Sequence, residues 1–96
     1  AEQADYKAVL LATCPPGARR DIYLLHIQPG SERCSQPHSP NTIEHLILTQ
    51  GRAEVGPVDS PVELEVGDYI SYPGDTEHIF RALEPDTLAV LVMEHV

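Results

Sequence analysis

Two short apolar segments, separated by a Gln50-Gly51 turn signal, lie within residues 42–56, which read TIEHLILTQGRAEVG. Neither segment carries the three-to-four-residue apolar spacing of an amphipathic helix. In the first segment both alternating sets of side chains include apolar residues, which is typical of a strand with one face in a core and the other against a partner sheet or subunit. The stretch therefore predicts two successive β-strands, and its first strand has a face that invites dimerisation.

The same alternation of apolar runs and turn signals extends along the rest of the chain. Nine prolines and six glycines cut the sequence into short runs. The opening residues 1–11 stay ambiguous because they contain good helix formers. About eight short strands at regular spacing favour a sandwich, jelly roll or small barrel. The predicted strands span residues 9–12, 22–28, 42–49, 52–55, 62–66, 69–72, 79–83 and 87–93.

Length and charge limit the functions open to the chain. Ninety-six residues suffice for one thin hydrophobic core, so we expect residues 1–96 to form a single domain. Fifteen acidic and six basic residues give a net charge of −9, which would repel a phosphate backbone and argues against direct nucleic-acid contact. No apolar run approaches the ~20 residues of a membrane span. With two cysteines, Cys14 and Cys34, in no metal or disulfide pattern, we expect a cytoplasmic protein with reduced thiols.

Three residues that could carry chemistry lie at the ends of predicted strands. His38 lies in the Pro-rich loop QPHSPN, residues 36–41, just before the strand that carries Glu44. His78 follows the turn PGDTE at residues 73–77 and opens the next strand. Binding sites on β scaffolds usually lie where loops meet strands. We therefore take His38, Glu44 and His78 as the candidate site.

The spacing of these residues resembles the two motifs of the cupin family. The first cupin motif is Gly, five residues, His-x-His, three or four residues, Glu, six residues, Gly, and this chain matches it at His38, Glu44 and Gly51. The second is Gly, five residues, Pro-x-Gly, two residues, His, three residues, Asn, and it is matched at Gly67, Pro73 and His78. The resemblance implies an all-β fold, the cupin double-stranded β-helix or jelly-roll barrel.

The chain also departs from both motifs. Pro40 stands where the first motif has its second histidine, so one family metal ligand is absent. Asp75 replaces the later glycine of the second motif, Ala82 stands at its Asn, and Gly30 is displaced from the start of the first motif. The resemblance nevertheless covers more than half of the chain, from Gly30 to Ala82.

Two interpretations of the candidate site follow from this comparison. Two imidazoles and one carboxylate could hold one divalent transition metal, such as Zn, Fe, Mn or Ni, with positions left open for a substrate. Alternatively, His38 and His78 hydrogen-bond Glu44 in a pocket that binds an organic effector and no metal. We favour the second interpretation, because a motif match without structural context is weak evidence.

Four further residues are secondary candidates for the pocket: Tyr69, Tyr72, Phe80 and Arg33. Aromatic residues in a small barrel more often fill the core, and Arg33 is more often a solvated charge than an anion ligand. His45 follows Glu44 directly and should point to the opposite face of its strand, at an interface or the surface. His26 and His95 lie in apolar strands and are expected to pack without a special role.

The resemblance extends to one subgroup of the cupins. Residues 37–56, GDY at 67–69 and YPGDTEH at 72–78 are similar to the C-terminal sensor domain of bacterial helix-turn-helix regulators of the xenobiotic-response-element type. In that group the DNA-binding helices precede the barrel. The chain begins at Ala1 rather than Met, and we expect it to be the C-terminal part of a longer transcriptional regulator. The resemblance implies a homodimer whose small-molecule effector biases an attached N-terminal DNA-binding domain.

These arguments favour a sensing module without catalytic residues over a complete enzyme. Two alternatives stay open. The first is a stand-alone metal-dependent cupin enzyme, such as a dioxygenase or an isomerase, that uses the same three residues as ligands. The second is a structural dimerisation barrel that binds no ligand.

Overall fold

The computed structural model describes residues 6–12, 20–30, 32–35 and 41–95, and the side chains of Tyr6 and of residues 32–35 lie outside this description. The described residues form nine β-strands and no helix. They therefore contain no helix that is long and apolar enough to cross a membrane. The strands are β1 (Tyr6–Ala12), β2 (Arg20–Ile27), β3 (Glu32–Ser35), β4 (Thr42–Gln50), β5 (Ala53–Pro57), β6 (Val62–Leu64), β7 (Tyr69–Pro73), β8 (His78–Ala82) and β9 (Thr87–His95).

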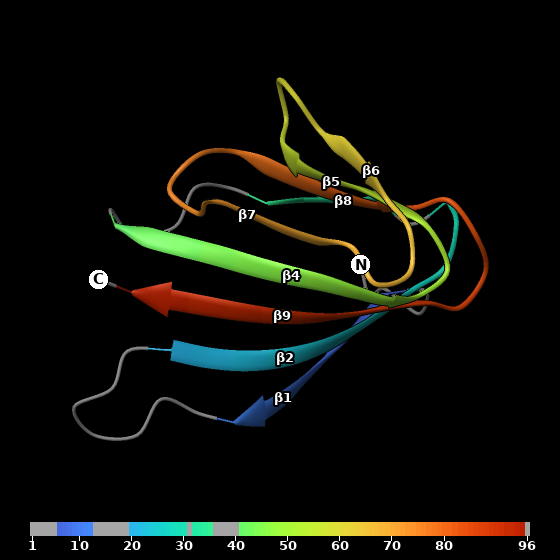
Figure 1. Cartoon of the computed structure of the whole chain (residues 1–96), viewed down its shortest axis with the longest axis horizontal. Coiled ribbons are helices and arrows are strands. Elements are labelled where there is room, and N and C mark those ends of the chain that lie inside the picture. Colours follow the sequence, from blue (N-terminus) through green and yellow to red (C-terminus); the bar gives the residue numbers. More distant parts are fainter. Residues whose placement is uncertain (1–5, 13–19, 31, 36–40, 96) are drawn as a thin grey trace.

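The strands pair into two antiparallel sheets, shown in Figure 1. Sheet A has the order β1-β2-β9-β4-β7, and sheet B has the order β3-β8-β5-β6. Neighbouring strands come from distant parts of the chain, since β9 lies between β2 and β4. Two packed sheets with such crossovers form a jelly roll, so the predicted fold class is confirmed.

Two strands differ from the sequence-based prediction. Strand β1 contains the strand predicted over residues 9–12 but begins earlier, at Tyr6, within the ambiguous opening residues. It pairs with β2 from Tyr6 opposite Ile27 to Ala12 opposite Ile22. Pairing with an existing sheet overrides the weak helix preference of these residues. The polar segment Glu32–Ser35 was not predicted as a strand, yet it forms β3 because it pairs with β8 in sheet B.

The hydrophobic core lies between the two sheets. In β4, buried Leu46 and Leu48 alternate with the more exposed His45 and Ile47, as expected when successive side chains point to opposite faces. The core therefore follows a two-residue period in each sheet. Its members are Leu25, Ile27, Leu46, Leu48, Ala53, Val55, Leu64, Tyr72, Phe80, Ala82, Ala89 and Leu91.

A tight turn at Gly51 connects β4 to β5. Gly51 has a φ of 85°, in the left-handed region that favours glycine. A Cβ at this position would clash with Thr87 Oγ1 and lie 3.0 Å from Thr87 Cα. The turn is packed against the start of β9, where the Thr87 hydroxyl donates to the Glu84 carbonyl oxygen at 2.7 Å. The glycine is thus required both by backbone conformation and by space.

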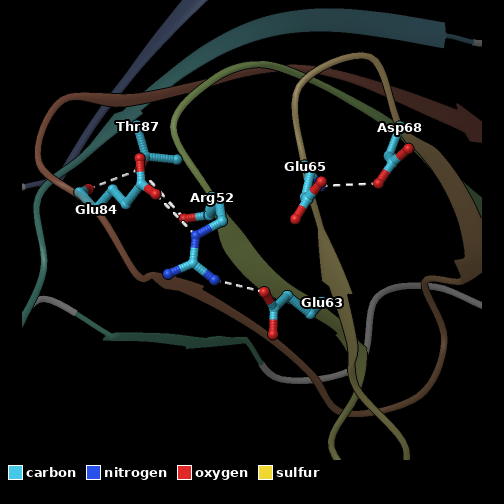
Figure 2. A network of polar contacts seen from close by, with 6 residues as sticks. All are labelled: Arg52, Glu63, Glu65, Asp68, Glu84 and Thr87. Atoms are coloured by element: carbon cyan, nitrogen blue, oxygen red, sulfur yellow. Dashed lines mark hydrogen bonds and ion pairs between the residues drawn. The ribbon is translucent and has the colours of Figure 1, made fainter.

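Figure 2 shows the ion pairs that tie this turn to its neighbours. Arg52 Nε lies 2.8 Å from Glu84 Oε2, and Arg52 Nη1 lies 2.5 Å from Glu63 Oε2. The hydrogen bonds that Arg52 donates to Glu84 and then to Glu63 raise the pKa of Arg52 above its ordinary value. The Leu83 amide also donates to the Arg52 carbonyl oxygen at 2.8 Å. Because these side chains are partly exposed, the ion pairs orient the turn more than they stabilise it.

The turn before β7 has a similar role at the other side of β4. Gly67 has a φ of 92°, and its amide donates to the Leu48 carbonyl oxygen at 2.8 Å. The Asp68 side chain accepts a hydrogen bond from the Glu65 amide at 2.8 Å, also visible in Figure 2. This turn brings β7 alongside β4, where it can contribute to the interior.

The two glycine turns allow a matched test of backbone strain against packing. Gly67→Ala should lower the free energy of unfolding by about 1–2 kcal/mol, the cost of a left-handed conformation for an L-residue. Gly51→Ala carries the same conformational cost and should cost about 1–3 kcal/mol more, because its Cβ would overlap Thr87. Urea denaturation of both variants measures the difference. Equal losses would show that the contact with Thr87 relaxes freely.

Candidate functional site

Glu44 and His78 lie together in the interior of the barrel. Glu44 is 2% exposed on β4, and His78 is 5% exposed at the first residue of β8. Glu44 Oε2 and His78 Nε2 are 3.1 Å apart. Strand alternation explains both positions, since Glu44 shares a face with Leu46 and His78 shares one with Phe80. Because both side chains point into the space between sheet A and sheet B, they meet there.

Tyr72 completes this group. It lies directly opposite Glu44 in the pairing of β7 with β4, so both side chains point inward. The Tyr72 hydroxyl donates to Glu44 Oε1 at 2.8 Å, and the Tyr72 and His78 ring centroids are 5.4 Å apart. We refer to Glu44, Tyr72 and His78 as the Glu44 cluster. One of the secondary candidates thus belongs to the centre of the site.

One hydrogen bond of His78 assigns a proton to its Nδ1. His78 Nδ1 lies 2.8 Å from the Thr76 carbonyl oxygen, which can only accept, so Nδ1 carries a proton. His78 Nε2 lies within ion-pair distance of Glu44 Oε2, so the two groups attract each other when the imidazole is protonated at both nitrogens. The cluster thus brings a carboxylate, a phenol and an imidazole together in a buried position.

The loop between β7 and β8 holds the Glu44 side chain in place. The Gly74 amide donates to the Thr42 carbonyl oxygen at 2.7 Å. A Cβ on Gly74 would lie 2.9 Å from Thr42 Cγ2 and 3.3 Å from Glu44 Cγ. Because only glycine allows this approach, the loop backbone packs directly against the carboxylate-bearing side chain. Sequence reasoning matched Pro73 and missed Gly74, although the Pro-Gly pair was a recognisable turn signal.

The remaining candidates do not join the Glu44 cluster in the described part of the chain. Phe80 is buried in the core on the same face of β8 as His78. Tyr69 is 56% exposed on the outer face of sheet A, because it pairs with outward-facing Ile47. Arg33 lies in β3 opposite Phe80, and its side chain is not described. Three residues named from the sequence lie outside the described residues: Cys14, His38 and Pro40.

Two polar residues near the cluster were not predicted to contribute. Thr42 is buried two residues before Glu44, and its Oγ1 lies 3.3 Å from His95 Nδ1. His95 continues the inward-facing parity of β9, which includes buried Leu91. The two-residue period of β9 could have revealed this position, which we expected to be plain packing. Thr42 and His95 therefore extend the polar lining from the Glu44 cluster toward one end of the barrel.

Glu44 and His78 alone do not make a transition-metal site. Such sites in proteins use three or four protein ligands. Among the side chains that the structure describes, in residues 7–12, 20–30 and 41–95, no group of three His, Cys, Asp or Glu is arranged to hold a metal ion. The third ligand predicted from the sequence, His38, lies outside that description. The described geometry is that of a buried carboxylate that accepts a hydrogen bond from Tyr72 and lies 3.1 Å from the His78 imidazole.

Comparison of the sequence with protein families identifies the family of this chain. A family model described as "Cupin domain" matches residues 23–94. The chain therefore belongs to the cupin domain family, as the motif spacing indicated. No protein with a curated description matches the sequence.

Several solved structures share the fold. An HTH_3 family transcriptional regulator from Vibrio cholerae superposes with a TM-score of 0.93 at 18% identity, over 99% of this chain and 53% of that one. The Cupin_2 domain of an XRE family regulator from Enterobacter cloacae gives 0.85 at 20% identity, over 96% of this chain and 97% of that domain. KdgF from Halomonas gives 0.80 at 21% identity, over 100% and 85%. The chain thus spans about half the length of the Vibrio protein, and these likenesses establish the fold.

Two tyrosines with different surroundings test the importance of the buried contact. Tyr72→Phe removes the donor to a buried carboxylate and should lower the free energy of unfolding by about 1.5–3 kcal/mol. Tyr69→Phe removes a hydroxyl that is bonded to His45 at an exposed position, and should cost less than about 1 kcal/mol. Chemical denaturation of the two variants measures both values. Similar losses would contradict the burial of the Glu44 cluster.

Proposed function

We propose that this chain is the small-molecule-sensing cupin domain of a bacterial transcriptional regulator, and that its effector binds at the Glu44 cluster. The observation that carries the proposal is the buried contact between Glu44 and His78. A buried ion pair adds little net stability compared with apolar residues of similar volume. Its presence in the thin core of a small barrel therefore favours a role in recognition. The regulators from Vibrio and Enterobacter support this proposal through their shared fold.

The cluster sets the chemistry of the proposed effector. Glu44 offers carboxylate oxygens as acceptors, Tyr72 offers a hydroxyl, and His78 offers an imidazole nitrogen that faces the carboxylate. Low surrounding polarity strengthens each hydrogen bond and penalises a ligand that leaves one unmade. An effector with a polar head group on an apolar body fits these conditions, because Tyr72 belongs to the same hydrophobic cluster as Phe80 and Leu91.

In this proposal, effector binding changes the preferred arrangement of an attached DNA-binding domain. With a net charge of −9, the chain is unsuited to bind DNA itself, so an N-terminal helix-turn-helix domain would make the contact. The effector must then bind one arrangement of a dimer more tightly than another, since equal affinity would shift nothing. In this proposal residues 1–96 are a single cytoplasmic domain at the C-terminal end of the regulator.

Ligand screening by thermal denaturation tests the assignment. We expect one or more small polar metabolites to stabilise the wild-type chain by about 2.7 kcal/mol at a concentration near 100 times Kd. Glu44→Gln and His78→Gln should weaken that ligand at least about tenfold, a loss of about 1.4 kcal/mol. His26→Gln, at an exposed histidine outside the cluster, is the matched control and should bind normally. Unchanged affinity in both cluster variants would refute the site.

Elemental analysis separates the sensor from a metal-dependent enzyme. The chain, purified without chelator or affinity-tag metal, should contain far less than one metal ion per molecule and remain folded, since the described site has two donors. The same measurement on His38→Ala and His78→Ala provides the control. Near-stoichiometric metal that disappears in both variants would instead favour a dioxygenase or isomerase with His38, Glu44 and His78 as ligands.

A further inference from the structure

One row of inward-facing residues in sheet A contains two carboxylates. Met93 lies directly opposite Asp21 in the pairing of β9 with β2, and directly opposite Glu44 in the pairing of β9 with β4. Tyr72 lies opposite Glu44 on the next strand, β7. Directly opposed residues of antiparallel strands point to the same face. The row therefore extends the Glu44 cluster across sheet A. We call it the acidic row; it consists of Asp21, Met93, Glu44 and Tyr72.

The two carboxylates of the acidic row are separated by one strand. Neighbouring strands lie about 4.8 Å apart, so the Cα atoms of Asp21 and Glu44 are about 10 Å apart. The side chain of Met93 lies between them on the same face. Both carboxylates thus face the same part of the interior, at a spacing that one small molecule can bridge.

The acidic row lies near the accessible end of the barrel. Asp21 and Met93 face inward, yet both keep part of their surface exposed. Inward-facing residues farther along the same strands, Leu25 on β2 and Ala89 on β9, are buried. In Figure 1 the accessible end is the one where β9 finishes, beside the label C. A ligand can therefore reach the acidic row from this end and meet apolar residues beyond it.

The described cations of the chain lie away from this interior. Lys7 and Arg20 alternate with inward-facing residues of β1 and β2, so both point to the outer face of sheet A. Arg52 and Arg81 form ion pairs with partly exposed glutamates. Among the side chains that the structure describes, no Lys or Arg therefore faces the acidic row. The net charge of −9 also attracts cations to the chain and repels anions.

Two tyrosine rings and a thioether complete the surroundings of the carboxylates. Tyr72 belongs to the acidic row, and Tyr23, two residues after Asp21, faces the same interior and packs against the core. The face of an aromatic ring attracts a cation within about 6 Å of its centre. The flexible, polarizable side chain of Met93 adapts to apolar groups of varied shape. Carboxylates beside aromatic and apolar side chains suit a positively charged group on an apolar body.

We propose that the effector of this domain is an organic cation, a primary ammonium or a guanidinium on an apolar body, held between Asp21 and Glu44. The inference rests on the proposed function for the place of binding and adds the charge of the ligand. The cationic head donates hydrogen bonds to the two carboxylates, and the apolar body lies against Met93 and Tyr23. Asp21 precedes the segment that matches the two sequence motifs, so it is a specificity residue of this chain.

Isothermal titration calorimetry with ligands of matched shape and different charge tests this inference. The probes are primary amines, diamines and alkylguanidines, each compared with the alcohol and the carboxylate on the same linear or phenylalkyl body. We expect one or more of the cations to bind the wild-type chain with Kd below about 1 mM, and the matched carboxylates to bind more weakly by at least about tenfold. Raising ionic strength from about 0.05 to about 0.5 M should weaken the cation, because salt screens its attraction to the carboxylates.

Two aspartate variants separate the acidic row from the general charge of the chain. Asp21→Asn should raise the Kd of the bound cation by about tenfold to a hundredfold, since it removes a charged hydrogen-bond acceptor. Asp59→Asn, at an exposed position between β5 and β6, removes the same charge elsewhere and should leave Kd within about twofold of wild type. Glu44→Gln should act like Asp21→Asn. If circular dichroism shows that Glu44→Gln is unfolded, the two aspartate variants decide the matter.

The outcomes distinguish a failure of this inference from a failure of the proposed function. If only alcohols or carboxylates bind, and Glu44→Gln and His78→Gln weaken them, the cationic effector is wrong and the proposed site stands. If no cation binds, or if Asp21→Asn and Asp59→Asn change its Kd equally, the inference is overturned. Cation binding that Glu44→Gln and His78→Gln leave unchanged would contradict the inference and the proposed site together.

Discussion

The pairing of β4 with β9 on one side and β7 on the other determines where every functional residue of this cupin domain lies. A shift of one residue in either register would send Glu44 outward and bring His45 into the core. The Gly51 turn, fixed against Thr87, and the Gly67 turn, bonded to Leu48, constrain the C-terminal end of this strand from two sides. The glycines of the sequence motifs thus act through register, because they prevent the slip that would separate Glu44 from Tyr72.

The Glu44 cluster illustrates how a small barrel can include a charged group at low cost. Glu44 Oε1 accepts a hydrogen bond from Tyr72, which favours the charged carboxylate, and Oε2 lies 3.1 Å from His78 Nε2. Close packing of Gly74 against Glu44 leaves the side chain little freedom. A carboxylate held in this way loses little further entropy when a ligand binds, and preorganisation of this kind raises affinity.

Most of the fold, but only part of the site, could be predicted from the sequence. Proline and glycine spacing located eight of the nine described strands, because turn chemistry is local. Strand β3 could not be found, since the polar segment Glu32–Ser35 becomes a strand only by pairing with β8. Motif spacing predicted Glu44 and His78 as site residues, and the structure brings these two into contact. It could not separate Tyr72 from Tyr69, because the inward parity of β7 is set by its alignment with β4. Gly74 and His95 depend on similar contacts between distant segments.

The adjacency of Glu44 and His45 has a mechanical consequence. One side chain belongs to the interior and the next to the exterior, so a single peptide unit supports both. Their Cα atoms are separated by only about 3.8 Å. A ligand that displaces the Glu44 carboxylate therefore also moves the backbone that positions the His45 imidazole on the outer face. A change inside the barrel would reach the outer face through the backbone of β4 alone, without a chain of intervening side chains.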